Sequence, residues 1–331
     1  MNYKRFLNAL TAFAAQCLFV LLVQDNVAAA AQSIPELHVQ PAERAPGALN
    51  TTILAAARAG ARIVAVGQRG VVLLSDNDGK TYRQAMSVPV SSTLTSVWFI
   101  DASTGWSVGD WGAIIKSTDG GETWVAQRSD TQVDQPLFSV YFKNGKEGWA
   151  VGLWSLMLHT TDSGANWAVV KLLPPAGAKK ADRNLYAMFA DTKGNLFVAC
   201  EQGRVMRSSD GGVSWNYVET GYAGSFWSGI ALRDGTILVG GLRGKIYRSA
   251  NGGDTWAAVP TPYASSITGM QQLPDQSIRM VGLEGVTLSS HDDGMSFTGY
   301  QRPDRKTLTA VIDTQKGHSV LFSVDGPTAS Q

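Results

Sequence analysis

The chain has 331 residues, with 28 basic and 27 acidic side chains, 44% hydrophobic residues, 35 glycines and 10 tryptophans. This composition excludes a disordered or fibrous protein. Charged residues are few, whereas glycines and tryptophans are numerous, which favours short strands joined by tight turns over long amphipathic helices. The composition therefore predicts an all-β fold.

The first thirty residues have the pattern of a secretory signal. Lys4 and Arg5 precede an apolar run from Phe6 to Val23, and small residues with Ala-x-Ala spacing follow at positions 28–31. We expect a signal peptide at residues 1–30 and an exported chain, soluble in a periplasmic or thylakoid-lumen-like compartment, with one domain at residues 31–331. A retained membrane anchor is the alternative, although the run is short for a membrane span.

Removal of residues 1–30 leaves equal numbers of acidic and basic side chains and one cysteine, Cys200. A neutral chain has no general attraction for nucleic acid or anionic lipid. The apolar residues around Cys200 favour a buried, unreactive thiol. The four histidines lack the spacing of metal ligands, so we expect neither a metal nor a cofactor. These are His38, His159, His291 and His318.

An eight-residue motif occurs six times. It has Ser or Thr first, Asp or Asn two positions later, Gly after four, Ser, Thr or Asn after six and an aromatic residue after seven. The copies occupy residues 75–82, 117–124, 160–167, 208–215, 249–256 and 290–297. They recur about every 43 residues, which is typical of a four-stranded propeller blade. We therefore predict a seven-bladed β-propeller.

The second repeat shows the strands of one blade, at residues 95–99, 105–109, 113–117 and 123–127. The last repeat has strands near 308–312 and 318–324 but no motif after them, so the seventh blade lacks an outer part. We expect Leu37 to Gln40 to add an N-terminal strand to it, which would cover the open edge and close the ring.

The Asp or Asn of each motif is expected to have a structural role. It can accept backbone N–H bonds, the glycine can adopt a positive φ, and the aromatic side chain can pack under the hairpin. Six equivalent copies favour structure over catalysis, because catalysis needs a carboxylate once or twice. These residues are Asn77, Asp119, Asp162, Asp210, Asn251 and Asp292.

The motif is the Asp-box, or BNR, repeat. With Gly-Trp-Ser/Ala-Val-Gly at Trp106 and Trp149, and Thr-Asp-Gly-Gly-x-Thr-Trp in the second repeat, the chain resembles the photosystem II assembly-factor family of exported propellers. The resemblance implies a propeller that binds subunits of a membrane-protein complex during assembly and has no catalytic activity. The family also occurs in bacteria without photosystems, and we expect a homologue of that kind. The fourth repeat departs from the pattern, with Ala199-Cys200-Glu201 in place of Val-Gly.

In a propeller, the turns between second and third strands share one face with the connectors between blades, and the Asp boxes lie on the other. We expect binding on the face without boxes. The predicted contacts with a partner are Arg69, Asp110, Trp111, Trp154, Arg243 and Glu284. Tryptophan and arginine at turns are typical of a hot spot for protein or sugar. Alternatively, each indole covers its own hairpin.

We expect a monomer with a protein partner, and a glycan is the alternative ligand. The connector at residues 171–184 is rich in lysine and is either an arm that contacts the partner or a solvated insertion. The second hypothesis for function is a carbohydrate-active enzyme, with a glycosidase favoured over a sialidase because no Arg-Ile/Leu-Pro segment is present. Glycosidases use paired carboxylates. The candidates are Asp110, Asp130, Asp134, Asp182 and Glu201.

Overall fold

The computed structural model describes residues 39–314 and 317–328. This part of the chain consists of strands, turns and six short 3₁₀ helices. The predicted signal peptide at residues 1–30 lies outside the described residues.

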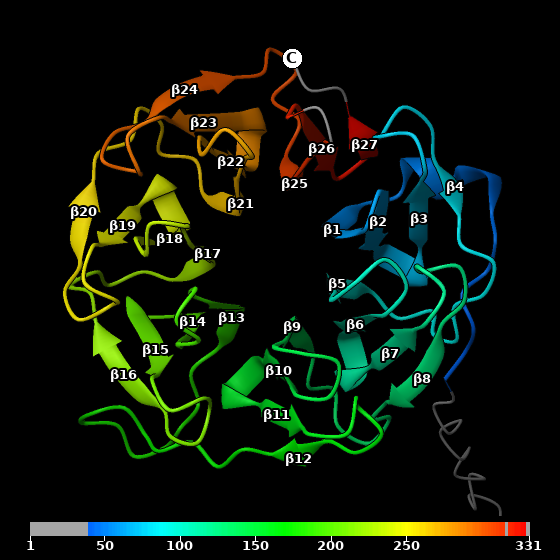
Figure 1. The fold of residues 1–331 in the computed structure, drawn as a ribbon, viewed down its shortest axis with the longest axis horizontal. Helices are drawn as coiled ribbons and strands as arrows, with labels where there is room; N and C mark the ends of the chain where they lie inside the picture. The colour runs from blue at the N-terminus through cyan, green and yellow to red at the C-terminus, as the bar shows by residue number, and fades with distance from the viewer. Residues whose placement is uncertain (1–38, 315–316, 329–331) are drawn as a thin grey trace, which may run out of the picture. The chain divides into compact units, whose positions relative to one another are not determined.

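Seven antiparallel sheets form a ring around a central axis (Figure 1). In each sheet the strands follow chain order from the centre outward, and the innermost strands of consecutive blades pack against one another all the way round to β1 and β25. Six sheets have four strands, and the described part of the seventh has three. The predicted seven-bladed, all-β propeller is confirmed.

The first three blades take up residues 53–169. Blade 1 contains β1 (Ile53–Ala59), β2 (Arg62–Gly67), β3 (Val72–Ser75) and β4 (Arg83–Gln84). Blade 2 contains β5 (Leu94–Phe99), β6 (Gly105–Gly109), β7 (Ile114–Ser117) and β8 (Val125–Arg128). Blade 3 contains β9 (Leu137–Phe142), β10 (Gly148–Gly152), β11 (Met157–Thr160) and β12 (Ala168–Val169).

The other four blades follow in the same order. Blade 4 contains β13 (Leu185–Ala190), β14 (Leu196–Cys200), β15 (Arg204–Ser208) and β16 (Asn216–Glu219). Blade 5 contains β17 (Phe226–Ala231), β18 (Ile237–Gly241), β19 (Ile246–Ser249) and β20 (Ala257–Val259). Blade 6 contains β21 (Ile267–Gln272), β22 (Ile278–Gly282), β23 (Val286–Ser290) and β24 (Thr298–Gln301). Blade 7 contains β25 (Leu308–Asp313), β26 (Ser319–Ser323) and β27 (Gly326–Thr328).

The predicted N-terminal closing strand lies only partly within the described residues. Of the expected closing strand, Leu37 and His38 lie outside the described residues, and Val39 and Gln40 are not in a strand. Blade 1 instead meets blade 7 directly, because Thr309 Oγ1 donates to Ile53 O, and Thr52 Oγ1 donates to Val324 O at 2.7 Å. The 3₁₀ helix η1 (Pro46–Asn50) lies against β27. Direct packing of the first and last blades thus joins the ends of the ring, and the described sheet of blade 7 contains only β25, β26 and β27.

Large apolar side chains fill the space between blades. Trp106 on β6 is fully buried, and its ring stacks on Phe142 of blade 3 with 3.5 Å between centroids. Trp149 holds the equivalent position in blade 3 and is also fully buried. The two Gly-Trp-x-Val-Gly segments are therefore core segments that attach one blade to the next.

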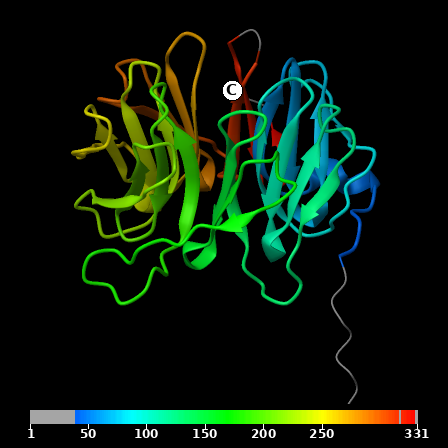
Figure 2. The ribbon, with the colours of Figure 1, turned by 60° about the horizontal axis from the view of Figure 1, so that its bottom comes forward.

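The loops lie on two opposite faces of the ring (Figure 2). On one face the boxes adjoin the turns between first and second strands, as when Gly120 N donates to Ser103 O at 2.9 Å. On the other, the turns between second and third strands adjoin the connectors, as when Leu153 N donates to Pro136 O at 3.0 Å. We call these the box face and the tip face. The long connector at residues 171–184 leaves the ring on the tip side, in green.

Candidate functional site

On the tip face, blades 1 to 6 each carry one residue in the same unusual backbone conformation. At the turn between second and third strands of blades 1 to 6, this residue has φ between 52° and 59°, although it is not glycine. For a residue with a side chain, this left-handed conformation costs about 1 kcal/mol or more. We call these the tip residues. They are Arg69, Trp111, Trp154, Gln202, Arg243 and Glu284.

Five of the six turns are 3₁₀ helices, and connectors hold them in place. These helices are η2 (Gln68–Gly70), η3 (Asp110–Gly112), η4 (Leu153–Ser155), η5 (Leu242–Gly244) and η6 (Leu283–Gly285). Trp111 O accepts a bond from Asp130 N at 2.8 Å, and Trp154 N donates to Asn184 Oδ1 at 3.1 Å. Hydrogen bonds from the connectors therefore fix the backbone of these two turns.

The tip side chains differ in exposure. Trp154 is 58% exposed, which is unusual for so large an apolar side chain, whereas Trp111 is partly buried. Arg69 and Arg243 are exposed. Arg69, Trp111 and Trp154 lie on the consecutive blades 1 to 3, so the structure places three of the predicted contacts side by side on one arc of the tip face.

The other predicted contacts lie farther round or deeper. Arg243 belongs to blade 5 and Glu284 to blade 6, where Arg305 lies 3.8 Å from the Glu284 carboxylate. Asp110 precedes Trp111 and is partly buried. Burial raises the pKa of the Asp110 carboxyl, a hydrogen bond with Thr93 opposes this rise, and the negative charge of Asp134 adds to it.

A second set of aromatic residues on the tip side escaped the sequence analysis. The second residue of every innermost strand is a β-bulge, where the register with the next strand shifts by one. In blades 2, 6 and 7 this residue is a threonine whose hydroxyl donates to a carbonyl of the next blade. In blades 3, 4 and 5 it is Phe138, Tyr186 and Trp227.

These three aromatic residues, the aromatic arc, are partly buried and occur on consecutive blades. Phe138 and Tyr186 stack with 5.5 Å between ring centroids. Asn184 links the arc to a tip, because its amide Nδ2 lies 3.4 Å from the Tyr186 hydroxyl while its Oδ1 accepts from Trp154 N. Comparing the same position in every repeat would have revealed the arc.

The Ser/Thr hydroxyl and the Asp or Asn of the box accept the same backbone bonds in each of the six blades. In blade 2 the Ser117 hydroxyl accepts from Gly121 N at 2.9 Å, and Asp119 Oδ1 accepts from Thr123 N at 2.9 Å. The Trp124 indole is 3% exposed beneath this turn and donates to Gly121 O at 2.9 Å. The equivalent bonds recur at Asn77, Asp162, Asp210, Asn251 and Asp292.

The remaining candidate groups are scattered or occupied. Asp130 and Asp182 each pair with a neighbouring arginine. Cys200 is fully buried, and burial raises the pKa of its thiol to about 12, so it has the environment of a small apolar residue. The described residues contain no cluster of three His, Cys, Asp or Glu side chains that could hold a metal. Within the same ranges no helix has the length and apolar character to cross a membrane.

Similarity to solved structures is clear at the level of fold. A structure titled "YCF48 bound to D1 peptide" matches with a TM-score of 0.68 and 17% identity, over 90% of this chain and 100% of that one. YCF48 from Cyanidioschyzon merolae matches with a TM-score of 0.64 and 14% identity, over 86% and 97% of the two chains. The extracellular domain of the putative one-component system BT4673 from B. thetaiotaomicron matches with a TM-score of 0.66 and 11% identity, over 88% of this chain and 39% of that one.

Sequence comparison identifies the family. No curated protein matches the sequence significantly. The family model described as "Photosynthesis system II assembly factor YCF48" matches residues 83–307, which extend from the outer strand of blade 1 to the connector before blade 7. This match covers more than half of the chain, and the two YCF48 structures share its fold. The chain therefore belongs to the photosystem II assembly factor YCF48 family.

Proposed function

We propose that this chain is an exported, non-catalytic scaffold that holds a subunit of a membrane-protein complex on its tip face. The observation that carries the proposal is the row of tip residues, which keep one strained backbone conformation while their side chains vary. Strained backbone is retained where the surrounding structure supports it and is concentrated at functional sites. The turns are thus a fixed frame for side chains of different chemistry.

The arc from blade 1 to blade 5 has the composition of a protein-binding surface. Trp111 and Trp154 are available as apolar anchors, the aromatic arc lies beside them, and Arg69 and Arg243 supply positive charge. Tryptophan, tyrosine and arginine are enriched among residues that dominate binding energy. A similar propeller, YCF48, has been solved with a D1 peptide bound, which supports a peptide segment of a subunit as the ligand.

Photo-crosslinking tests this proposal directly. A benzophenone amino acid replaces Trp154 on the tip face or, as the control, Val213 in a box, which is 85% exposed. In the envelope fraction of the host, we expect position 154 to crosslink to a membrane-protein subunit and position 213 not to do so. Crosslinking to the same proteins from both positions, or from position 213 alone, contradicts the assignment of the tip face.

A glycosidase is the second candidate, and one observation favours it. Asp110 is partly buried, and Asp134 raises the pKa of its carboxyl further, as in a pair of acids that share a site. Hydrolysis of an oligosaccharide panel by the purified protein, abolished by Asp110→Asn with unchanged stability, would support this candidate against the scaffold. The scaffold predicts no turnover by either protein.

A further inference from the structure

Among residues 39–314 and 317–328, the interface between blades 6 and 7 lacks a contact that the other interfaces share. In the other blades, the residue three positions before the end of the second strand, which is the Trp of Gly-Trp-x-Val-Gly, contacts the box of the next blade. Trp106 Nε1 donates to Ser163 O, and Trp149 lies against Gly212. The residues that make such a contact are Val64, Trp106, Trp149, Phe197, Leu238 and Val320.

Blade 6 has Arg279 at this position, and the part of blade 7 that the structure describes contains no box for it to reach. A charged side chain therefore replaces the apolar side chains of the other blades, and the described residues of blade 7 place no box opposite it. Among the described residues, Arg279 forms no hydrogen bond or ion pair, and its Nε atom is buried without a partner. Leaving a guanidinium partly buried and unpaired is costly, unless something else supplies the acceptor.

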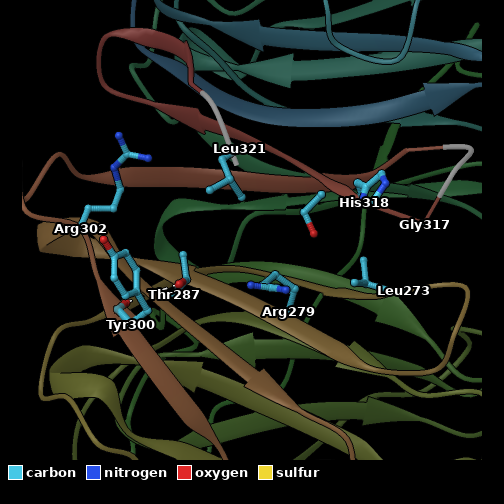
Figure 3. A pocket seen from close by; sticks show the side chains of 9 residues that line it. Leu273, Arg279, Thr287, Tyr300, Arg302, Gly317, His318 and Leu321 are labelled. Atoms are coloured by element: carbon cyan, nitrogen blue, oxygen red, sulfur yellow. Dashed lines mark hydrogen bonds between the residues drawn. The ribbon is translucent and has the colours of Figure 1, made fainter. Parts of the chain in front are cut away.

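A cavity of about 280 Å³ occupies the space in front of Arg279. Figure 3 shows Arg279 and Thr287 on blade 6 facing Leu321 and His318 on blade 7. Ser319 also lines the cavity. It is 9% exposed, and its Oγ atom is buried without a hydrogen-bond partner. Two residues with unpartnered polar atoms thus line the same cavity from different blades, and the lining contains no carboxylate.

The chemistry of the lining selects an anion with an apolar part. Arg279 can donate two parallel bonds to a carboxylate, and Ser319 can donate one more. Leu273, Leu321 and the ring of Tyr300 provide apolar surface beside these donors. Arg302 at the rim already forms an ion pair with Asp304. Arg279 is therefore the main charged contact for an anion in the cavity. We propose that this cavity binds a small organic carboxylate, independently of a partner on the tip face.

Calorimetric titration of the purified propeller with benzoate tests the proposal, with neutral benzamide and inorganic phosphate as comparison probes. We expect benzoate to bind at one site and benzamide at least tenfold more weakly, because only benzoate neutralises Arg279. Arg279→Leu copies Leu238 of blade 5 and should fold, while weakening benzoate binding at least tenfold. Ser319→Ala should weaken it several-fold. Arg207→Leu, at an arginine paired with Asp254 elsewhere, is the control and should leave it unchanged.

Three results overturn the proposal. They are the absence of benzoate binding at about 10 mM probe, equal binding of benzoate and benzamide, and unchanged benzoate binding by a folded Arg279→Leu variant. Phosphate binding more tightly than benzoate would overturn the assignment to a carboxylate. A circular dichroism spectrum and a melting curve for each variant separate loss of the site from loss of the fold.

Discussion

The box face and the tip face are built from the same repeated units, yet their residues follow opposite rules. In the boxes both the backbone and the side chains recur, so that Asp119 and Asp292 accept equivalent bonds in blades 2 and 6. On the tip face only the backbone recurs, and the residue at one position changes from arginine to tryptophan to glutamate. Repetition of side chains indicates a role that every blade needs, which is closing its outer hairpin.

Variation over a fixed backbone indicates a different role. A left-handed turn would be easiest for glycine. Its retention at six residues of four different kinds, at such a cost, favours selection for what those side chains contact. Substitutions on the box side should therefore reduce stability and spare binding, whereas substitutions on the tip face should do the reverse.

The largest expected effect is at the buried tryptophans beneath the boxes. Trp149→Ala removes a fully buried indole that lies against Gly212 of the next box, and a cavity would remain between two blades. We expect the free energy of unfolding to fall by about 3–5 kcal/mol. Urea denaturation measures this loss. Partner binding by the folded fraction should persist, and a loss of binding in fully folded protein would contradict the division between the faces.

On the tip face, Trp111→Ala combined with Trp154→Ala should weaken partner binding more than tenfold. Truncation of a tryptophan at the centre of an interface typically removes about 2–4 kcal/mol of binding free energy. Because Trp154 is 58% exposed in the free protein, the free energy of unfolding of this variant should change little. Titration against the crosslinked subunit, together with a melting curve, checks both expectations. Unchanged affinity would support the alternative hypothesis, in which each indole only covers its own hairpin.

A smaller effect is expected in the boxes themselves. Asp119→Ala removes the acceptor for Thr123 N and should cost about 0.5–2 kcal/mol, by analogy with other side-chain caps. Asp119→Asn should cost less, because Asn77 and Asn251 already hold the same turn and donate to the threonine hydroxyl instead of accepting from it. Chemical denaturation of the two variants measures the difference, and equal losses would contradict this account.

Charge reversal at Arg69 and Arg243 should act mainly on the association rate. Exposed charges at the rim of an interface steer the approach of a partner but add little to the bound state. We expect slower association, a weaker dependence on salt and nearly unchanged dissociation, measured by surface plasmon resonance at several salt concentrations. If only the dissociation rate changed, these arginines would instead lie in the desolvated centre of the interface with the partner.

The boxes should also make stability sensitive to acid. Bonds from the hydroxyl groups and backbone of their own turns lower the pKa of Asp210 and Asp292 to about 2. In the unfolded chain the pKa of an aspartate is about 3.9, so these groups stabilise the fold above that value, and the contribution is lost as pH falls toward 2. Urea denaturation between these pH values should show that the free energy of unfolding falls progressively with pH. In Asp210→Asn this fall should be smaller.

The repeat count and the strand pattern were readable from the sequence because each blade needs the same hairpin chemistry. The Gly-x-Ser/Thr-aromatic spacing at Trp124 and Trp215 indicated the blade length, and the repeated Gly-Trp-x-Val-Gly segments at Trp106 and Trp149 indicated second strands. The turn positions of Arg69, Trp111, Trp154, Arg243 and Glu284 followed from the same repeats. Family membership rests on these local patterns and agrees with the match over residues 83–307.

The closing strand, the aromatic arc and the cavity at Arg279 depend on residues that are distant in the sequence. Direct bonds from Thr309 to Ile53 join the ends of the ring, and no local pattern near Leu37 encodes them. Tyr186 meets Phe138, and Arg279 faces Ser319, only because the ring brings separate blades together. Local sequence determined each blade through hydrogen bonds within hairpins, whereas packing between blades decided which side chains share a surface.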